Sequence, residues 1–218
     1  MNAITKKRIK FASLVIALIA ATSLLSFCQS SNHSWTIRLQ GEDGPISSHT
    51  TRADLVRQFG AANVTDKDVD VGEGETEHGT VVFPNDPKRM IQILWKDGHL
   101  NQSTKSAQVD GDSSLWKAEH GVVLGTSLKE LKTLNQKPFK LFGFDWDYAG
   151  TVSSWEDGSL SKDLAEHGRV VVRLNYQDRS QIKDDELQQV SGESEFSSQH
   201  LVMQKINPRV YQLIWIFE

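Results

Sequence analysis

The sequence predicts an α+β protein made of two similar units, each a helix followed by an antiparallel meander, and the two meanders can share one curved sheet. Three observations support this prediction. Apolar residues alternate with polar ones in several short segments, as in half-buried strands. Two segments combine a helix-capping signal with helical apolar spacing. Several turn signals recur in the same order in both halves of the chain.

Length and composition agree with a folded domain. The chain has 218 residues, 38% of them hydrophobic, which is enough to bury a core. The single cysteine excludes a disulfide within the chain. We divide the chain into a signal peptide at 1–27, a tether and first strand at 28–48, a first α+β unit at 49–118, and a second unit with C-terminal strands at 119–218.

The first 27 residues predict export. A basic cluster at residues 6–10 precedes the uncharged residues 11–27, and this order is typical of a secretory signal. As a helix, these 17 residues reach about 26 Å, slightly less than a hydrocarbon core of about 30 Å. An uncleaved membrane anchor is therefore the alternative.

The only cysteine lies directly after this segment. Leu25, Ser26 and Cys28 resemble a bacterial lipobox, in which the cysteine is lipidated after cleavage. Phe27 departs from that pattern, because the residue before the cysteine is usually small. The alternative is ordinary signal-peptidase cleavage. With Gln29 after the cysteine, the resemblance implies export to an outer membrane. We expect an extracytoplasmic, periplasmic protein that is tethered at Cys28.

The net negative charge of the chain argues against partners that are themselves strongly negative, such as nucleic acids and anionic lipids. The full chain has a formal net charge of −4, and removing residues 1–27, which hold four basic residues, leaves −8. A negative surface repels phosphate backbones, so nucleic-acid binding is not expected. No polybasic patch is available for anionic lipid, so contact with a membrane is expected only through the N-terminal lipid or an uncleaved anchor.

The predicted elements begin with a strand. Trp35, Ile37 and Leu39 alternate with polar residues. Residues 51–60 predict a helix, because a hydroxyl residue stands three positions before a carboxylate and glycine stands at the end. Residues 127–134 repeat the capping signal and the apolar spacing.

Each predicted helix is followed by Gly-Thr-Val, at 79–81 and 150–152, and then by Trp-x-Asp-Gly-x-Leu, at 95–100 and 155–160. Asp-Gly is a strong hairpin signal, because glycine accepts the positive φ of a tight turn. Both halves are therefore predicted to run helix, strand, hairpin turn, strand.

Other segments complete the prediction. Glu-His-Gly occurs at 77–79, 119–121 and 166–168, and we interpret each copy as a turn that starts a strand rather than as a catalytic site. A polar stretch at 180–195 predicts a short helix or a loop. Further strands are predicted at 91–95, 170–174, 201–203 and 210–217. The last of these is apolar on both faces, so we expect it to be covered on both sides.

One acidic segment has calcium-ligand spacing. Asp66, Asp68, Asp70 and Glu77 echo the positions of ligands in an EF-hand loop. Val71 stands where the loop requires glycine, and no convincing helix leads directly into Asp66. The alternatives are a calcium-dependent binding module and an acidic, solvent-exposed segment.

The run Gly-Phe-Asp-Trp-Asp-Tyr-Ala-Gly at 143–150 is the most unusual in the chain. Its alternation predicts a strand with aromatic residues on one face and carboxylates on the other. Aromatic rings beside a carboxylate can stack on a sugar or a peptide, and an aromatic pair closing a hairpin core is the alternative. The predicted binding residues are Asp145, Trp146, Asp147, Tyr148 and Trp155.

Catalytic motifs are absent from the sequence. It contains no Gly-x-Ser-x-Gly, no His-Glu-x-x-His, no phosphate-binding Gly-x-x-x-x-Gly-Lys, and no cysteine after Cys28. We therefore predict no catalytic residue, no cofactor and a non-enzymatic protein. The alternative is an envelope glycan hydrolase that uses Asp145 or Asp147 with a distant glutamate, about 5–10 Å away.

The tandem helix-and-meander pattern over residues 45–176 is similar to the β-lactamase-inhibitory-protein-like and small outer-membrane-lipoprotein-A-like modules of bacterial envelopes. Residues 124–131 and 143–148 also resemble segments of uncharacterised bacterial lipoproteins. The resemblance implies an α+β fold and binding of protein partners, and it transfers no site residue. We expect an exported, lipid-anchored, non-enzymatic protein that recognises an envelope protein or an envelope polymer.

Overall fold

The structure is a computed structural model that describes residues 34–39, 44–100, 102–165 and 169–217. The signal peptide, Cys28 and the third Glu-His-Gly copy lie outside the described residues. Ser34–Glu218 packs as one unit. Among the described residues, no helix is both long and apolar enough to cross a membrane.

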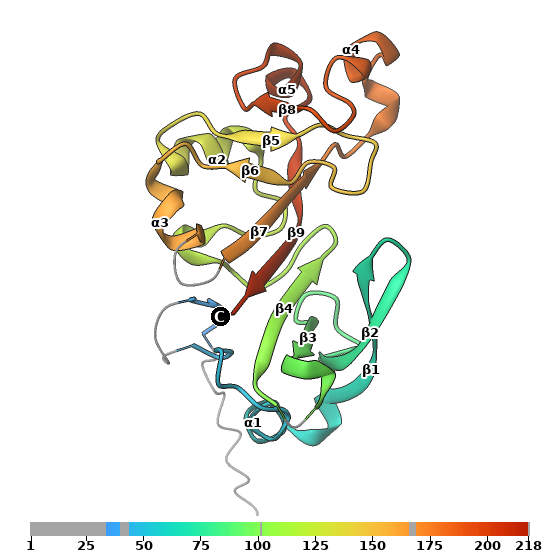
Figure 1. The fold of residues 1–218 in the computed structure, drawn as a ribbon, viewed down its shortest axis with the longest axis vertical. Helices are drawn as coiled ribbons and strands as arrows, with labels where there is room; N and C mark the ends of the chain where they lie inside the picture. Colours follow the sequence, from blue (N-terminus) through green and yellow to red (C-terminus); the bar gives the residue numbers. More distant parts are fainter. Residues whose placement is uncertain (1–33, 40–43, 101, 166–168, 218) are drawn as a thin grey trace, which may run out of the picture. The chain divides into compact units, whose positions relative to one another are not determined.

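The described residues form two antiparallel sheets and five α-helices, an α+β fold, as the sequence predicts (Figure 1). The large sheet has the order β1 (Val64–Gly72), β2 (Glu75–Val82), β3 (Ile91–Trp95), β4 (Thr104–Asp110), β9 (Arg209–Ile216) and β7 (Arg169–Asn175). The small sheet has the order β6 (Val152–Ser154), β5 (Lys140–Phe142) and β8 (Glu195–Ser197). The large sheet therefore runs on from the first predicted unit into the second through the pairing of β4 with β9.

The helices are α1 (Arg52–Phe59), α2 (Leu128–Asn135), α3 (Ser159–Ala165), α4 (Asp184–Gln188) and α5 (Leu201–Ile206). Both predicted capping signals are confirmed. The Thr51 hydroxyl accepts the Asp54 backbone N–H, and the Asp54 carboxylate accepts the Thr51 N–H in return. Ser127 and Glu130 make the same reciprocal pair at α2. Gly60 ends α1 at a φ of 85°, as expected for a glycine stop.

The α2 cap carries a prediction about stability and pH. The backbone N–H and the hydroxyl of Ser127 donate to Glu130, and these bonds lower the pKa of its carboxyl. A lowered folded-state pKa stabilises the fold at neutral pH, and that contribution is lost as the pH falls through the folded pKa. Glu130→Ala should cost about 1 kcal/mol at pH 7 in urea unfolding, and the difference from the wild type should shrink below about pH 4.

Lys129→Ala, on the exposed side of the same turn, is the control and should change the unfolding free energy by less than about 0.5 kcal/mol. A Glu130→Ala deficit that stays constant down to pH 3 would show that the carboxylate charge does not contribute.

Four sequence predictions outside the candidate binding face are wrong or incomplete. The segment at 155–160 is a turn that leads into α3 instead of a second strand. Residues 201–203 begin α5 instead of a strand, with the His200 side chain accepting the Val202 N–H. The first Glu-His-Gly copy lies inside β2, although the second does form a one-turn 3₁₀ segment. The predicted strand at 35–39 makes one parallel bridge, from Thr36 to Lys117.

The first Trp-x-Asp-Gly copy behaves as predicted. Asp97 and Gly98 have φ values of 55° and 68°, and the strands on either side of them, β3 and β4, pair antiparallel. Positive φ at both residues makes a tight turn, closed by the His99 N–H on the Lys96 carbonyl, within the longer connection from Trp95 to Thr104.

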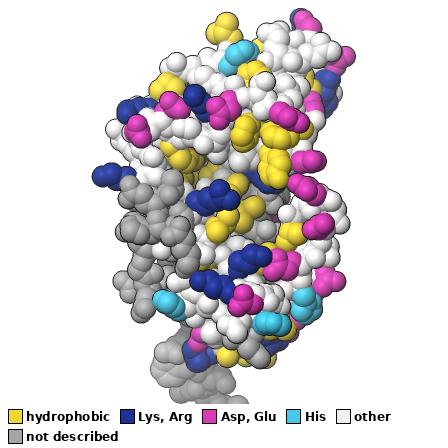
Figure 2. Space-filling view, viewed as in Figure 1, with side chains coloured by type: hydrophobic (Ala, Val, Ile, Leu, Met, Phe, Trp, Pro, Cys, Tyr) yellow, Lys and Arg dark blue, Asp and Glu magenta, His cyan; other side chains and the backbone are white. Residues whose placement is uncertain are grey.

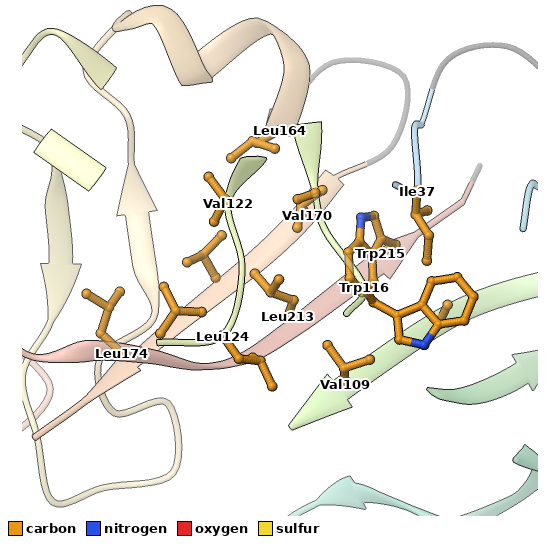
Figure 3. Packing of buried hydrophobic residues seen from close by; sticks show 14 of the residues in the cluster. Ile37, Val109, Trp116, Val122, Leu124, Leu164, Val170, Leu174, Leu213 and Trp215 are labelled. Atoms are coloured by element: carbon orange, nitrogen blue, oxygen red, sulfur yellow. The ribbon is translucent and has the colours of Figure 1, made fainter. Parts of the chain in front are cut away.

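The main core lies on one face of the large sheet. Figure 3 shows Val109, Leu213 and Trp215 from β4 and β9 packed toward Val122 and Leu124, which precede α2. All five side chains are buried. Burial of each such side chain contributes roughly 1.5–3 kcal/mol, so this layer fixes the orientation of β4, β9 and β7.

Candidate binding face

One face of β4, β9 and β7 lies opposite the core. We call it the open face. The strand register aligns Gln108 with Ile214 and Val171 in one cross-strand row. Figure 1 shows no helix in front of these three strands. The open face comprises Ser106, Gln108, Asp110, Gln212, Ile214, Ile216, Arg169, Val171 and Arg173.

The middle of the open face is apolar. Val171, Ile214 and Ile216 are half-buried, and they belong to neither of the two buried hydrophobic clusters of the described residues. The sequence predicted that both faces of β9 would be covered. Instead, Leu213 and Trp215 are buried on one face while the isoleucines on the other remain partly exposed. The prediction for β9 is therefore wrong for one face.

The β1–β2 hairpin bounds the open face on one side. Val69, Val81 and Leu94 form a small second cluster beneath it. In a flat sheet β1 and β4 would lie three strand spacings apart, about 14 Å. Nevertheless, the Gln108 side-chain amide donates to the Asp70 carbonyl at 3.0 Å. The hairpin must therefore fold over the sheet toward β4, where Ser106 and Gln108 are buried, while the apolar side chains of β9 and β7 on this face remain partly exposed.

The predicted aromatic segment forms a turn at the end of this face, not a strand. The Gly150 N–H donates to the Gly143 carbonyl at 3.1 Å and closes the turn. The Trp146 and Tyr148 rings have centroids 5.3 Å apart and are tilted by 60°. Trp146 also packs edge-on against Phe142, at 5.4 Å. We call residues 144–150 the aromatic turn.

Tyr148 connects the aromatic turn to the tip of the β1–β2 hairpin and to β7. Its hydroxyl donates to the Glu73 carboxylate at the hairpin tip, at 3.0 Å. This hydrogen bond, with the negative charge of Glu73, raises the pKa of the Tyr148 phenol. The Arg173 guanidinium carbon lies 5.9 Å from the centroid of the Tyr148 ring, within the range of a cation–π interaction.

The other predicted binding residues make different contacts. The Asp145 carboxylate accepts the Tyr176 hydroxyl at 2.9 Å, and its second oxygen lies 3.0 Å from the Ser191 hydroxyl. Asp145 therefore fastens the aromatic turn to the chain after β7. Asp147 is exposed. Trp155 is buried in the core against Phe139, with ring centroids 5.2 Å apart, so the structure does not bring it together with Trp146 and Tyr148.

The four calcium candidates do not converge. Asp66, Asp68 and Asp70 alternate along β1 and share one face, whereas Glu77 pairs with Val69 on the other face. This places the acidic segment in a strand, and among the described residues no group of three His, Cys, Asp or Glu could hold a metal ion.

Neighbouring side chains already bind most of these carboxylates. Asp66 accepts hydrogen bonds from Arg52 and Thr80, both at 2.8 Å. Asp68 lies 3.0 Å from a ring nitrogen of His78. Lys105 donates to Glu77 at 2.8 Å.

Sequence reasoning missed the charged residues of the open face. Arg169 and Arg173 point to the same side of β7 as Val171, and neither forms an ion pair within the described residues. Figure 2 shows Lys and Arg side chains beside hydrophobic ones in the middle of this view, with Asp and Glu along the β1–β2 side. The available signal was the pattern Arg-Val-Val-Val-Arg at 169–173, which puts both arginines and the middle valine on one face of a strand.

Buried polar atoms without partners occur in the same region. The structure leaves the Arg173 Nε, the Gln212 Oε1 and the Thr151 Oγ1 buried and without a hydrogen bond. The register places these residues in one row, since Arg173 is opposite Gln212 on one side and Thr151 on the other. A buried polar group without a hydrogen bond lowers the stability of a fold, and such groups are rare in proteins. Three of them in one cross-strand row therefore call for a functional explanation.

A groove lies beside α2, away from the open face, with a volume of about 740 Å³. Its polar groups already serve the fold. The Glu130 carboxylate caps α2, and Arg209 donates to the Gly125 carbonyl at 2.8 Å. The lining residues are His120, Gly121, Val123, Leu124, Gly125, Thr126, Lys129, Glu130, Thr133, Leu134 and Arg209. On the open face, by contrast, Arg169 and Arg173 have no ion pair within the described residues, so we take the open face as the candidate binding site.

Comparisons with known proteins add no functional assignment, because the chain matches no protein-family model, no curated protein and no solved structure.

Proposed function

We propose that this chain is an exported, non-enzymatic binding protein of the bacterial cell envelope, tethered through Cys28, and that it binds a protein partner through the open face and the aromatic turn. The observation that carries the proposal is the half-buried apolar row of Val171, Ile214 and Ile216, which no helix covers. Interface cores combine such apolar residues with aromatic and arginine side chains, as occur here at Tyr148 and Arg173.

A protein partner fits this surface better than a glycan polymer. Sugar stacking needs a flat aromatic face, but Trp146 and Tyr148 are tilted against each other by 60° and already contact Phe142 and Arg173. The aliphatic row beside them suits apolar protein side chains more than a hydroxylated polymer.

The geometry gives the alternative glycan hydrolase no support. A retaining or inverting hydrolase places two carboxyl groups on opposite sides of the scissile bond. Both oxygens of Asp145 face hydroxyl groups of this chain, and Asp147 lies exposed in the aromatic turn. Neither residue lines the groove beside α2.

Site-specific photo-crosslinking tests the proposed binding face in cells that naturally make the protein. A photoreactive residue at Ile214 should give one discrete crosslinked product with an envelope protein. The same residue at Thr133, exposed on α2, should not give that product. Ile214→Asp should remove the partner from affinity capture by at least about tenfold while leaving the fold intact, because a charge replaces an apolar contact.

The lipid tether at Cys28 is tested in the same cells. Wild-type protein should incorporate a fatty-acid label and Cys28→Ala should not. Equal crosslinking from Ile214 and Thr133 would contradict the binding face, and an unlabelled wild-type chain would contradict the tether.

A further inference from the structure

We infer that the partner presents an acidic surface to the open face, with carboxylate groups received by Arg169 and Arg173. This inference rests on the proposed function and adds the chemistry of the partner to it. Four observations lead to it: the local charge, the free arginines, the unpaired polar row and the position of the apolar strip.

The charge of the open face differs from that of the whole chain. The chain has a net charge of −4, yet Arg169 and Arg173 stand on β7 and Lys105 reaches the same side from β4 to bind Glu77. Asp110 shares this face, and Glu77 and Glu73 border it from the hairpin. The uncompensated positive charge is therefore confined to β7, where Arg169 and Arg173 favour an acidic partner.

The arginines are available to such a partner. Arg52 and Lys105, near the large sheet, each have a carboxylate, Asp66 and Glu77 respectively. Arg169 is exposed and Arg173 is half-buried, and neither has a carboxylate within 4.0 Å in the described residues. A planar guanidinium suits a carboxylate because two parallel N–H groups can donate to its two oxygens.

Arg173 is also held in position for this role. Its guanidinium carbon lies 5.9 Å from the Tyr148 ring centroid, and its Nε is buried without a hydrogen-bond acceptor, next to the unpaired Gln212 and Thr151. Because Nε is buried, a partner carboxylate would bind the part of the half-buried guanidinium that remains exposed. Such a bond is worth more on a partly desolvated face than in water.

The apolar row decides between a protein and other acidic ligands. Val171 and Ile214 lie between the two arginine positions along the strands. An acidic protein segment can place apolar side chains on this row and carboxylates on both sides of it. Anionic glycans and lipid headgroups supply the charge but leave the apolar row without a contact, so they serve as the comparison ligands.

The test measures binding of defined polyanions to the soluble mature chain at low ionic strength. Poly-L-glutamate is the probe for acidic protein, and alginate and phosphatidylglycerol vesicles are the comparison probes. Poly-L-glutamate should bind most tightly and weaken as salt is added. Arg169→Gln combined with Arg173→Gln should reduce that binding by at least about tenfold.

The matched control is Lys129→Gln combined with Lys132→Gln on α2, which removes the same charge and should change binding less than about twofold. Arg173→Lys keeps the charge without the planar fork and should bind at an intermediate level. Urea unfolding checks that each variant is folded, and Arg169→Gln alone, at an exposed position, should still lose part of the binding.

Three results would overturn the inference: no binding of poly-L-glutamate, equal loss in the α2 control, or tighter binding of alginate or of the vesicles. These results are separable from a failure of the proposed function. A partner crosslinked from Ile214 that is not acidic would leave the binding face in place and remove only the acidic partner.

Discussion

Gly150→Ala is expected to destabilise the fold by about 3 kcal/mol or more. Gly150 has a φ of 64°, which most side chains disfavour, and a Cβ built on it would lie 1.8 Å from the Leu174 carbonyl oxygen. Leu174 cannot move away easily, because its N–H donates to the Gly150 carbonyl at 2.9 Å and β7 is fixed by its pairing with β9. Urea unfolding of the variant should show a lower midpoint with a similar slope.

Gly98→Ala is the control that measures the cost of positive φ without the steric overlap with Leu174. Gly98 has a similar φ of 68°, but a Cβ there would meet nothing within 4 Å. It should cost only about 1 kcal/mol, which is the conformational part of the penalty. Equal losses for the two variants would show that the contact with Leu174 is relieved by local movement. Since Gly150 closes the aromatic turn, Gly150→Ala should also weaken binding at the open face.

Local signals in the sequence predicted the parts of the fold that depend on neighbouring residues. The caps of α1 and α2 form because Thr51 with Asp54, and Ser127 with Glu130, can satisfy each other within one turn. The hairpin at Asp97 follows from the same kind of short-range preference.

Segments that depend on distant contacts were assigned wrongly. The alternation in 143–150 resembles a strand, but Gly143 packs so closely against another chain segment that a Cβ would lie 2.5 Å from the Gly192 carbonyl oxygen. That contact, with the Phe144 to Ser191 bridge, ends the strand at Phe142 and bends the chain. The partner segment is almost fifty residues away, so no local pattern could indicate it.

The candidate site was predicted only in part, for the same reason. Trp146 and Tyr148 were predicted because aromatic and acidic residue types are concentrated in 143–150. Both side chains do reach the surface at the end of the open face. Arg169, Arg173 and Ile214 were missed, because strand alternation shows which residues share a face but not whether another layer covers it. Only the folded hairpin and the positions of the helices show that this face is uncovered.

Asn135→Ala is expected to destabilise the fold by about 3 kcal/mol. The Asn135 side chain is fully buried at the end of α2. Its amide nitrogen donates to the carbonyls of Lys137 and Trp155, at 3.0 and 2.9 Å, and its oxygen accepts the Leu160 N–H at 3.1 Å. These bonds direct the chain after Trp155 into α3 rather than into a hairpin. Alanine would leave all three backbone groups without a partner, and each costs about 1 kcal/mol or more when buried.

Asn135→Asp gives a second measurement of the same site. A carboxylate there would face two carbonyl oxygens in a buried position, so burial should raise its pKa and make this variant at least as unstable as Asn135→Ala at pH 7. Relative to the wild type, it should regain stability as the pH falls through that raised pKa, because the neutral carboxyl can donate one hydrogen bond. Thr133→Ala, exposed on α2, should cost less than about 0.5 kcal/mol in the same urea titrations. If Asn135→Ala unfolds at the same midpoint as Thr133→Ala, the amide does not select the α3 conformation, and the buried contacts of Leu160 and Leu164 must do so instead.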